Sequence, residues 1–293
     1  MNFSANPVGL DDPTCYYSEA YHSCFDMQIC LHFTSFRSKS SESVRLLISS
    51  DTITTKRGQI YGRTFFEENG KSELERTFTI LKDNDTCFQL PKVLVKPKFE
   101  DKLTPLEFSV ALLPGPEERT SFCPDCPIFR GRMNWTSTIF FENGCGSDRK
   151  CLSVLSVGAL TSIRGEQVND LISGEYDTLD VEVTVENTGE LSYGTRMMLE
   201  VSPALNVYRL HQSCTFKKDA DTTKTKIECD AGNPLDSSAI VNITLDITDL
   251  DPQFDAIVMQ MTLSSASEID ALSVDKASLV LPVKRVASVS IEA

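Results

Sequence analysis

The sequence of 293 residues has no long apolar run and is short of basic residues. No segment approaches the roughly 18–20 consecutive apolar residues of a membrane-spanning helix. The first residues also lack the basic and then apolar order of a signal peptide. The 28 Lys and Arg residues are outnumbered by 42 Asp and Glu residues, which gives a formal net charge of −14. So acidic a chain is a poor partner for nucleic acid or an anionic membrane, because phosphate binding needs a basic surface.

Catalytic motifs are equally scarce. The chain has three histidines, His22, His32 and His211, and none of them lies in an HExxH or similar metal-ligand spacing. No serine occupies a G-x-S-x-G nucleophile elbow, and no glycine-rich phosphate loop follows a predicted strand. We therefore expect no catalytic residues and predict that the chain is not an enzyme.

The composition is that of a folded, exported protein. With 41% apolar residues, 14 Gly and 13 Pro, the chain is neither disordered nor collagen-like, and its length allows two ordinary domains. Ten cysteines and four Asn-x-Ser/Thr sequons favour a secreted or cell-surface protein with disulfides and glycans. The acidic charge fits an extracellular or calcium-rich setting. Because no export signal is visible, we expect the sequence to be a fragment of a longer chain. The candidate glycosylation sites are Asn2, Asn84, Asn134 and Asn242.

Period-two alternation predicts strands almost throughout. No segment keeps apolar residues at i, i+3, i+4 and i+7 over three turns, so helices are not expected. Turn clusters such as Asn187-Thr-Gly189 separate the strands every 8–15 residues, which is typical of β-sandwiches. We predict an all-β chain of two tandem sandwiches. The clearest predicted strands span residues 24–33, 44–49, 106–113, 138–141, 152–157, 179–186, 195–201, 240–247, 257–263 and 278–283.

A polar segment at the midpoint, Phe141 to Cys151, is the predicted domain boundary. It carries two glycines and two cysteines between two apolar strands. A short disulfide ring there would make a stiff elbow, unlike a Gly/Ser tether. The predicted domains are residues 1–141 and 142–293.

The cysteine pattern leaves several readings open. Cys123-Pro-Asp-Cys126 fits a redox pair, half of a zinc site or a local structural disulfide. A structural disulfide is favoured, because no helix is predicted there and the next cysteines, Cys145 and Cys151, lack zinc-site spacing. Sandwich geometry favours pairing between cysteines close in sequence, yet spacing alone does not select among roughly 945 arrangements of ten cysteines.

Five segments resemble the integrin α subunit in the leg region that follows its β-propeller head. Their order and spacing match over residues 15–293. The segments are Cys24-Phe-Asp-Met-Gln-Ile-Cys30, Phe99-Glu-Asp-Lys-Leu-Thr-Pro-Leu106, Asn143-Gly-Cys-Gly-Ser-Asp-Arg-Lys-Cys151, Asn187-Thr-Gly-Glu-Leu-Ser-Tyr193, and Cys214-Thr-Phe-Lys with Cys229-Asp-Ala-Gly-Asn-Pro-Leu235.

The resemblance implies a thigh domain followed by calf-1, both immunoglobulin-like β-sandwiches joined by a disulfide-closed knee, or genu, loop. The family's opening R-P-V segment has no counterpart, so the first edge strand of the thigh is expected to be missing. Cys123 and Cys126 have no counterpart either, and their pairing rests on proximity alone. The implied disulfides are Cys15–Cys24, Cys30–Cys87, Cys145–Cys151 and Cys214–Cys229.

The resemblance also implies a structural calcium ion at the knee. Its ligands map onto the side chains of Asp148 and Glu190 and the backbone carbonyls of Cys145 and Lys150. Calcium takes six to eight hard oxygens and accepts mixed carboxylate and carbonyl donors, so this set is chemically reasonable. Without the resemblance, the two acids are ordinary surface residues in a loop and a turn.

The implied function is that of a leg segment in a heterodimeric cell-adhesion receptor. The partner would be an integrin β subunit, and a head outside this sequence would bind matrix or cell-surface proteins. The location would be the cell surface, in the extracellular part of a single-pass membrane protein whose span lies outside this chain. Two alternatives remain: a generic secreted module of two sandwiches without a bending role, and a disulfide-active or zinc enzyme using Cys123 and Cys126.

Overall fold

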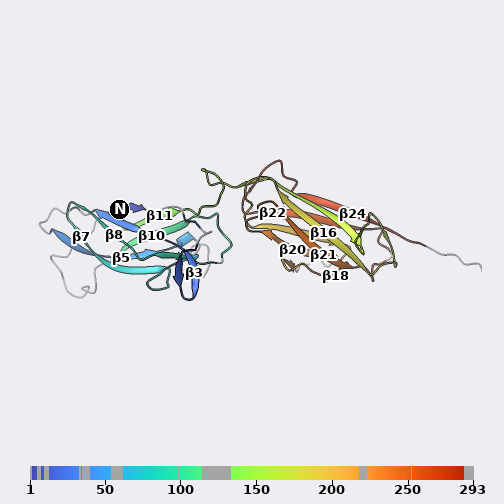
Figure 1. The fold of residues 1–293 in the computed structure, drawn as a ribbon, viewed down its shortest axis with the longest axis horizontal. Coiled ribbons are helices and arrows are strands. Elements are labelled where there is room, and N and C mark those ends of the chain that lie inside the picture. Colours follow the sequence, from blue (N-terminus) through green and yellow to red (C-terminus); the bar gives the residue numbers. More distant parts are fainter. Residues whose placement is uncertain are drawn as a thin grey trace, which may run out of the picture. The chain divides into compact units, whose positions relative to one another are not determined.

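The computed structural model describes residues 2–4, 8–9, 13–32, 34, 40–53, 62–97, 99–113, 133–217, 223–251 and 253–286 (Figure 1). The chain divides into two compact units, Met1–Glu142 and Asn143–Ala293, called here the first unit and the second unit. The division falls one residue after the predicted end of the first domain. Strands make up nearly all the regular structure of the described residues, as the period-two pattern predicts.

The first unit is built from three antiparallel sheets around a main apolar core, with a smaller apolar cluster of Cys15, Phe65 and Leu94 beside it. The sheets have the strand orders β1-β4-β8, β11-β10-β5-β7 and β2-β3-β9-β6. Alternate residues of the long strands face inward, and Ile48, Phe66 and Phe108 are fully buried between the sheets. The strands are β1 (Asn2–Ser4), β2 (Cys15–Tyr17), β3 (Ala20–Phe25), β4 (Gln28–His32), β5 (Ser41–Ser49), β6 (Thr64–Phe66), β7 (Glu73–Leu81), β8 (Asp85–Gln89), β9 (Val93–Val95), β10 (Leu106–Leu113) and β11 (Asn134–Ile139).

The single strand predicted over residues 24–33 is wrong. The chain there forms two strands, β3 and β4, which belong to different sheets. Between them lies Met27, which is 1% exposed and whose carbonyl accepts a hydrogen bond from the Leu90 N–H at 2.9 Å. Because Phe25, Met27 and Ile29 keep apolar residues at every second position through this corner, alternation along the sequence does not reveal where the chain changes sheets.

A buried ion pair lies inside the first unit. Asp51 is 0% exposed and Arg63 is 4% exposed. The Asp51 carboxylate accepts hydrogen bonds from Arg63 N, Nε and Nη2 at 2.6, 3.0 and 2.7 Å. The rest of the guanidinium donates to three backbone carbonyls at 2.7–3.0 Å, so every polar edge of the pair has a partner. Those carbonyls belong to Asp101, Thr104 and Pro105.

The same guanidinium reaches the last residues of the first unit. It lies 5.4 Å from the ring centroid of Phe141, which also packs on Phe99 at 5.3 Å between ring centroids. Phe141 is 4% exposed and forms a β-bridge with Val8. We call Arg63, Asp51, the loop 101–105 and Phe141 the Arg63 clamp. It holds the end of the first unit against its core.

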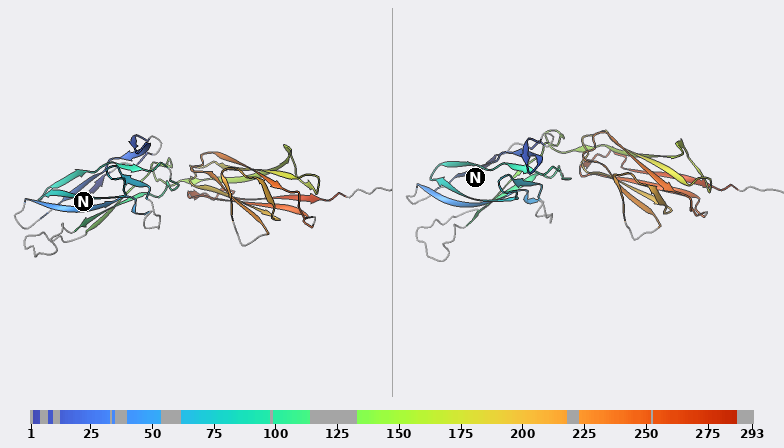
Figure 2. Two further views of the ribbon diagram at one scale, coloured as in Figure 1. Left: turned by 90° about the horizontal axis from the view of Figure 1, so that it is seen from below. Right: turned by 60° about the horizontal axis from the view of Figure 1, so that its bottom comes forward.

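The second unit is a sandwich of a five-stranded and a six-stranded sheet, which can be followed in Figures 1 and 2. The orders are β14-β13-β16-β21-β18 and β15-β24-β22-β17-β20-β19, and β12 pairs with β23 beside them. Val183, Leu199 and Met259 are fully buried in the core between the sheets. The strands are β12 (Leu152–Ser153), β13 (Leu155–Ile163), β14 (Glu166–Gln167), β15 (Leu171–Ile172), β16 (Thr178–Asn187), β17 (Thr195–Ser202), β18 (Asn206–Arg209), β19 (Cys214–Phe216), β20 (Thr225–Gly232), β21 (Ser238–Asp246), β22 (Ala256–Ser264), β23 (Glu268–Ile269) and β24 (Lys276–Lys284).

The strands predicted between residues 179 and 283 are confirmed. The observed strands β16, β17, β21, β22 and β24 begin and end within two residues of the predicted bounds. The alternation is clean in β16, where Leu179, Val181, Val183 and Val185 are buried and the residues between them are not. These strands have one wet face and one core face, which is the condition under which period two is readable.

Four disulfides lie within the described residues, two in each unit. They are the four that the family resemblance implies. Cys123 and Cys126 lie outside the described residues. The described part of the chain contains no helix with the length and hydropathy of a membrane span. The disulfides are Cys15–Cys24, Cys30–Cys87, Cys145–Cys151 and Cys214–Cys229.

Candidate functional site

A disulfide ring opens the second unit. Cys145 and Cys151 are 0% and 3% exposed, and their Cα atoms lie 4.9 Å apart. Residues 146–150 between them are exposed, so the ring has a buried base and an exposed rim. Gly146 has a φ of 68°, a conformation that glycine adopts without strain. We call residues 145–151 the ring.

Asn143 fastens the ring to the second unit. Its side chain donates to the Arg149 carbonyl at 3.1 Å and accepts from the Cys145 N–H at 3.2 Å, bridging the two ends of the loop. The Asn143 carbonyl in turn accepts from the Tyr193 hydroxyl at 3.0 Å. Sequence analysis did not predict these roles. The polar side chain of Asn143 is 7% exposed, and it is buried because each of its ends has a partner.

The turn that carries Glu190 is docked on the strand that leaves the ring. The Glu190 N–H donates to the Leu152 carbonyl at 3.0 Å, and the Leu152 N–H donates to Glu190 Oε2 at 2.9 Å. Asn187 closes the turn, because its side chain accepts from the Gly189 N–H at 3.1 Å and donates to the Glu190 carbonyl at 2.7 Å. A Cβ on Gly189 would lie 2.5 Å from the Val154 nitrogen, so only glycine allows this close approach.

The ring and the turn bring two carboxylates to one place. A Cβ built on Gly146 would lie 3.8 Å from Glu190 Oε1 and 3.9 Å from Asp148 Oδ1. Asp148 and Glu190 are 42 residues apart in the sequence, and both are exposed. Two acids that converge at a surface ring repel each other unless a cation or water separates them. The arrangement can therefore attract a hard cation.

The other predicted ligands differ in their surroundings. Cys145 lies at the buried base of the ring, and Lys150 lies on its rim, where its N–H donates to Asp148 Oδ1 at 3.2 Å. The Lys150 ammonium is 3.9 Å from Glu268 Oε1. Across the described residues, no group of three or more His, Cys, Asp or Glu side chains is placed to hold a metal. A cation at the ring would thus have two carboxylates as its acidic ligands and would need carbonyl or water oxygens as well.

The three histidines lie in three different local environments. His22 is buried against the Phe65 ring, with Nδ1 3.1 Å from the Val95 carbonyl oxygen. His32 is exposed and pairs with Asp85 at 2.9 Å. His211 lies 2.9 Å from the Ser213 hydroxyl. Each histidine has a local structural partner, and the described contacts join none of them to another histidine.

The predicted glycosylation sites occupy different settings. Asn84 is exposed in the turn between β7 and β8. Asn134 is exposed at the start of β11, the outermost strand of its sheet. Asn242 is exposed within β21, which is paired on both sides. Asn2 belongs to β1, and its side chain lies outside what the structure describes.

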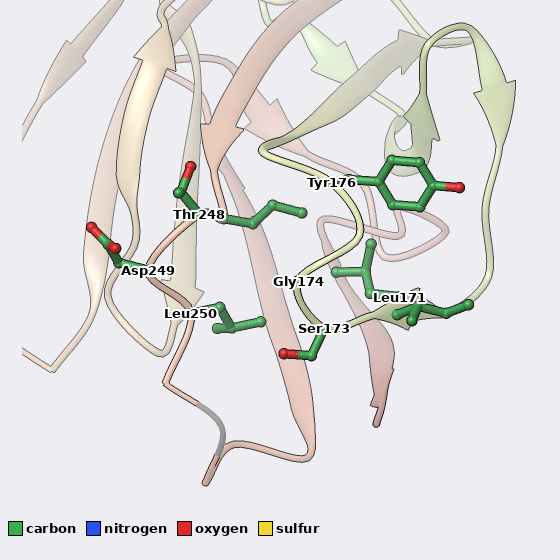
Figure 3. A pocket seen from close by; sticks show the side chains of 9 residues that line it. Leu171, Ser173, Gly174, Tyr176, Thr248, Asp249 and Leu250 are labelled. Carbon is green, nitrogen blue, oxygen red and sulfur yellow. The ribbon is translucent and has the colours of Figure 1, made fainter. Parts of the chain in front are cut away.

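A surface pocket of about 360 Å³ lies elsewhere in the second unit. Figure 3 shows that its lining comes from two segments, 171–176 and 247–250. The lining includes the Tyr176 and Asp249 side chains but no histidine, cysteine, lysine or arginine. Its polar side chains are those of Ser173, Tyr176, Thr248 and Asp249.

Family comparison covers both units. A family model described as integrin alpha Ig-like domain 1 matches residues 1–138, and one described as integrin alpha Ig-like domain 2 matches residues 145–283. The gap between the two matches falls at the observed division between the units.

Individual relatives give the same result. Mouse integrin alpha-X is 28% identical over 194 residues, covering 65% of this chain and 16% of the relative. Chicken integrin alpha-V is 26% identical over 251 residues, covering 78% of this chain and 23% of the relative. Human integrin alpha-D is 29% identical over 247 residues, covering 78% of this chain and 20% of the relative. The chain thus spans less than a quarter of the length of these relatives.

Proposed function

The chain belongs to the integrin α family as a leg segment, and from this premise we propose that it contains the knee at which an adhesion receptor bends. One observation carries the proposal: the anchoring contacts of one unit stop where those of the other begin. The Glu142 N–H donates to the Val8 carbonyl at 3.0 Å, within the first unit. The next residue, Asn143, is held by the ring and by Tyr193. Rotation between two rigid bodies would then be confined to the backbone joining Glu142 to Asn143.

A calcium ion at the ring is the second element of the proposal. The convergence of Asp148 and Glu190 on one side of Gly146 supports it, since both are exposed and supply the carboxylate oxygens that calcium prefers. The backbone carbonyls of Cys145 and Lys150 would complete the protein ligands. The ion would supply one thing when bound, a positive charge that neutralises the two acids.

The chain's own residues prepare that position. Asn187 and Gly189 hold the turn so that Glu190 Oε2 is engaged by the Leu152 N–H and Glu190 Oε1 faces the ring. Asn143 and the disulfide fix the ring at its base. Neutralising Asp148 and Glu190 would fasten the rim as well. The ring would then move with the second unit as one body, and bending would be left to the residues before it.

The remaining parts of the proposed function concern the whole receptor. We propose that the full protein pairs with an integrin β subunit, stands on the cell surface with this segment outside, and takes part in integrin-mediated signalling. Ligand would be bound by a head outside this sequence. The segment itself would transmit shape and carry out no reaction, in keeping with the family's role as non-enzymatic adhesion receptors.

Calcium-dependent unfolding tests the ring. We expect millimolar calcium to raise the unfolding temperature of the second unit, and the pair Asp148→Ala with Glu190→Ala to abolish that rise. The matched control, Glu166→Ala with Asp236→Ala, removes the same charge from two exposed positions of the same unit and should keep the calcium response. If millimolar calcium left the unfolding temperature of the unaltered chain unchanged, the proposed calcium ion would be ruled out.

Small-angle scattering tests the bending. We expect the radius of gyration of the full chain to differ between calcium and chelator, and the Asp148→Ala, Glu190→Ala chain to scatter alike in both. A single shape under all conditions would leave the calcium site intact but favour a two-sandwich module without a bending role.

A further inference from the structure

The outer face of the five-stranded sheet in the second unit exposes two apolar side chains beside a sequon. Leu160 and Ile240 are 54% and 53% exposed, and Asn242 is exposed on the same face. The inward-facing neighbours Val241 and Ile243 are each 1% exposed, so the two faces of the strand are clearly distinguished. A soluble sheet normally places polar residues on its wet face, so a group that covered these two apolar side chains would remove apolar surface from water.

Strand register places these residues around Asn242. Asn242 lies opposite Glu182 on β16, and Glu182 lies opposite Leu160 on β13. Ile240 precedes Asn242 by two residues on β21 and therefore points to the same side, about 7 Å away along the strand. The sequon asparagine thus has an apolar neighbour along its strand, an apolar neighbour two strands away, and a carboxylate between.

An open area lies next to these side chains. Gly158 pairs with Thr184, which pairs with Ile240. A Cβ on Gly158 would meet nothing within 4 Å. The outer face is therefore open above Gly158, which lies two residues from Leu160 on β13 and is separated from Ile240 by Thr184. We call this open area, together with the space over Thr184 as far as Ile240, the shelf.

We propose that Asn242 carries an N-linked oligosaccharide whose first sugars lie across this shelf and cover Leu160 and Ile240. Sugar rings present apolar C–H faces, which can bury apolar side chains, and hydroxyl groups, which can donate to the Glu182 carboxylate. The face that they cover is closed to protein partners, so contacts of the second unit with other proteins are left to its remaining surfaces. The proposal rests on export of the chain, which the proposed function requires.

The attachment is a group transfer without redox change. The Asn242 side-chain nitrogen forms a bond to C1 of an N-acetylglucosamine, and the bond from C1 to the diphosphate of a lipid-linked oligosaccharide donor breaks. The lipid diphosphate leaves with the electron pair. The amide nitrogen gives up one proton to a base of the transferring enzyme.

The fold requires the transfer to precede folding of the sheet. β21 pairs with β16 at all three sequon residues, Asn242 to Thr244, and with β18 from Thr244 onward. The sequon hydroxyl of Thr244 donates to Asp180 Oδ1 at 2.7 Å. Both the backbone and the hydroxyl of the sequon are occupied in the folded unit, so an enzyme that must bind them acts on the unfolded strand.

Site occupancy is the first test, measured by glycopeptide mass spectrometry on the full chain secreted from animal cells. We expect Asn242 to be occupied, together with the exposed reference sites Asn84 and Asn134. Occupied reference sites with a bare Asn242 would overturn this inference and leave the proposed function standing. If all three were bare, this inference would fail as well, while the proposed function would still be decided by the calcium and scattering experiments.

Coupling between glycan and shelf is the second test. Ile240→Ser should lower the unfolding temperature of the glycosylated chain by about 2–3 °C more than it does in an Asn242→Gln background. Leu160→Ser should behave in the same way. Val280→Ser is the matched control, because Val280 is 54% exposed on the other sheet, and its effect should be equal in both backgrounds. Equal effects of Ile240→Ser in the two backgrounds would show that the sugars do not cover the shelf.

Discussion

The end of the first unit and the start of the second unit are held by different chemistry. At the end of the first unit, Arg63 is buried with Asp51 and reaches the Phe141 ring. At the start of the second unit, a disulfide closes a ring whose rim is exposed. The hydrogen-bond partners of Arg63 in the clamp lie 12 to 42 residues away in sequence, and Phe141 lies 78 residues away (141 − 63), whereas the ring joins residues only six apart.

The difference assigns distinct tasks to the two sides of the division. The clamp has each of its polar groups satisfied by protein, which makes it rigid and leaves it no capacity for a ligand. The ring keeps two carboxylates on its surface, where an ion from solution can reach them. The first unit would therefore end in a contact that no ligand changes. The second unit would begin with a ring whose rigidity depends on a bound cation.

Breaking the clamp should have the largest effect. Arg63→Met leaves Asp51 buried without its partner, and we expect the first unit to lose about 3–5 kcal/mol of unfolding free energy. Fluorescence of Trp135, the single tryptophan, reports this unit in urea unfolding. The control Arg76→Met removes an exposed pair with Glu68 and should cost less than about 1 kcal/mol. Equal losses from the two variants would contradict the clamp.

Opening the ring should have a smaller effect, confined to the second unit. Cys145→Ser with Cys151→Ser removes a link between residues six apart, and the chain-entropy estimate for such a loop is about 2 kcal/mol. Calorimetry should show the transition of the second unit at a lower temperature, while the Trp135 transition stays in place. A shift of the Trp135 transition would mean that the two units do not unfold independently.

Removing calcium should lower the stability of the second unit by less than opening the ring does, and should leave the first unit unchanged. A site of the affinity common in extracellular modules, at millimolar calcium, adds about 1 kcal/mol to the unit that binds it. Chelation should therefore lower only the calorimetric transition of the second unit. An equal response of the Trp135 transition would place a calcium site in the first unit as well.

The smallest predicted effect concerns an ion pair on the six-stranded sheet. The hydrogen bond from Lys217, at 2.6 Å, lowers the pKa of Glu228. A carboxylate with a lowered pKa stabilises the fold above its unfolded pKa, about 4.3, and this stability is lost as the pH falls through the folded pKa. Glu228→Gln should cost less than about 1 kcal/mol at pH 7, and the difference from the unaltered chain should shrink below about pH 4. A difference independent of pH would exclude the pair as its source.

The strands of the second unit were predicted more accurately from the sequence than the contacts at the end of the first unit and at the start of the second. Long strands with one solvent-exposed face, such as β16, are predicted correctly by alternation. The corner at Met27 is not, because the alternation continues from β3 into β4. The turn at Asn187-Thr-Gly189 was predicted, because asparagine and glycine are common turn residues, but its contacts with Leu152 and Val154 were not. Arg63 carried no local signal, since its partners lie in segments that only the folded chain brings together.

The sequence by itself determined the all-β class, the midpoint boundary and, through resemblance, the family and the four described disulfide pairs. These follow from patterns within a few residues or from motifs whose order survives in the chain. Only the tertiary structure decided that Arg63 is buried against Asp51, that Asn143 fastens the ring, and that Asp148 and Glu190 face the same point. Burial and convergence depend on which distant segments pack together, and packing is a property of the whole fold.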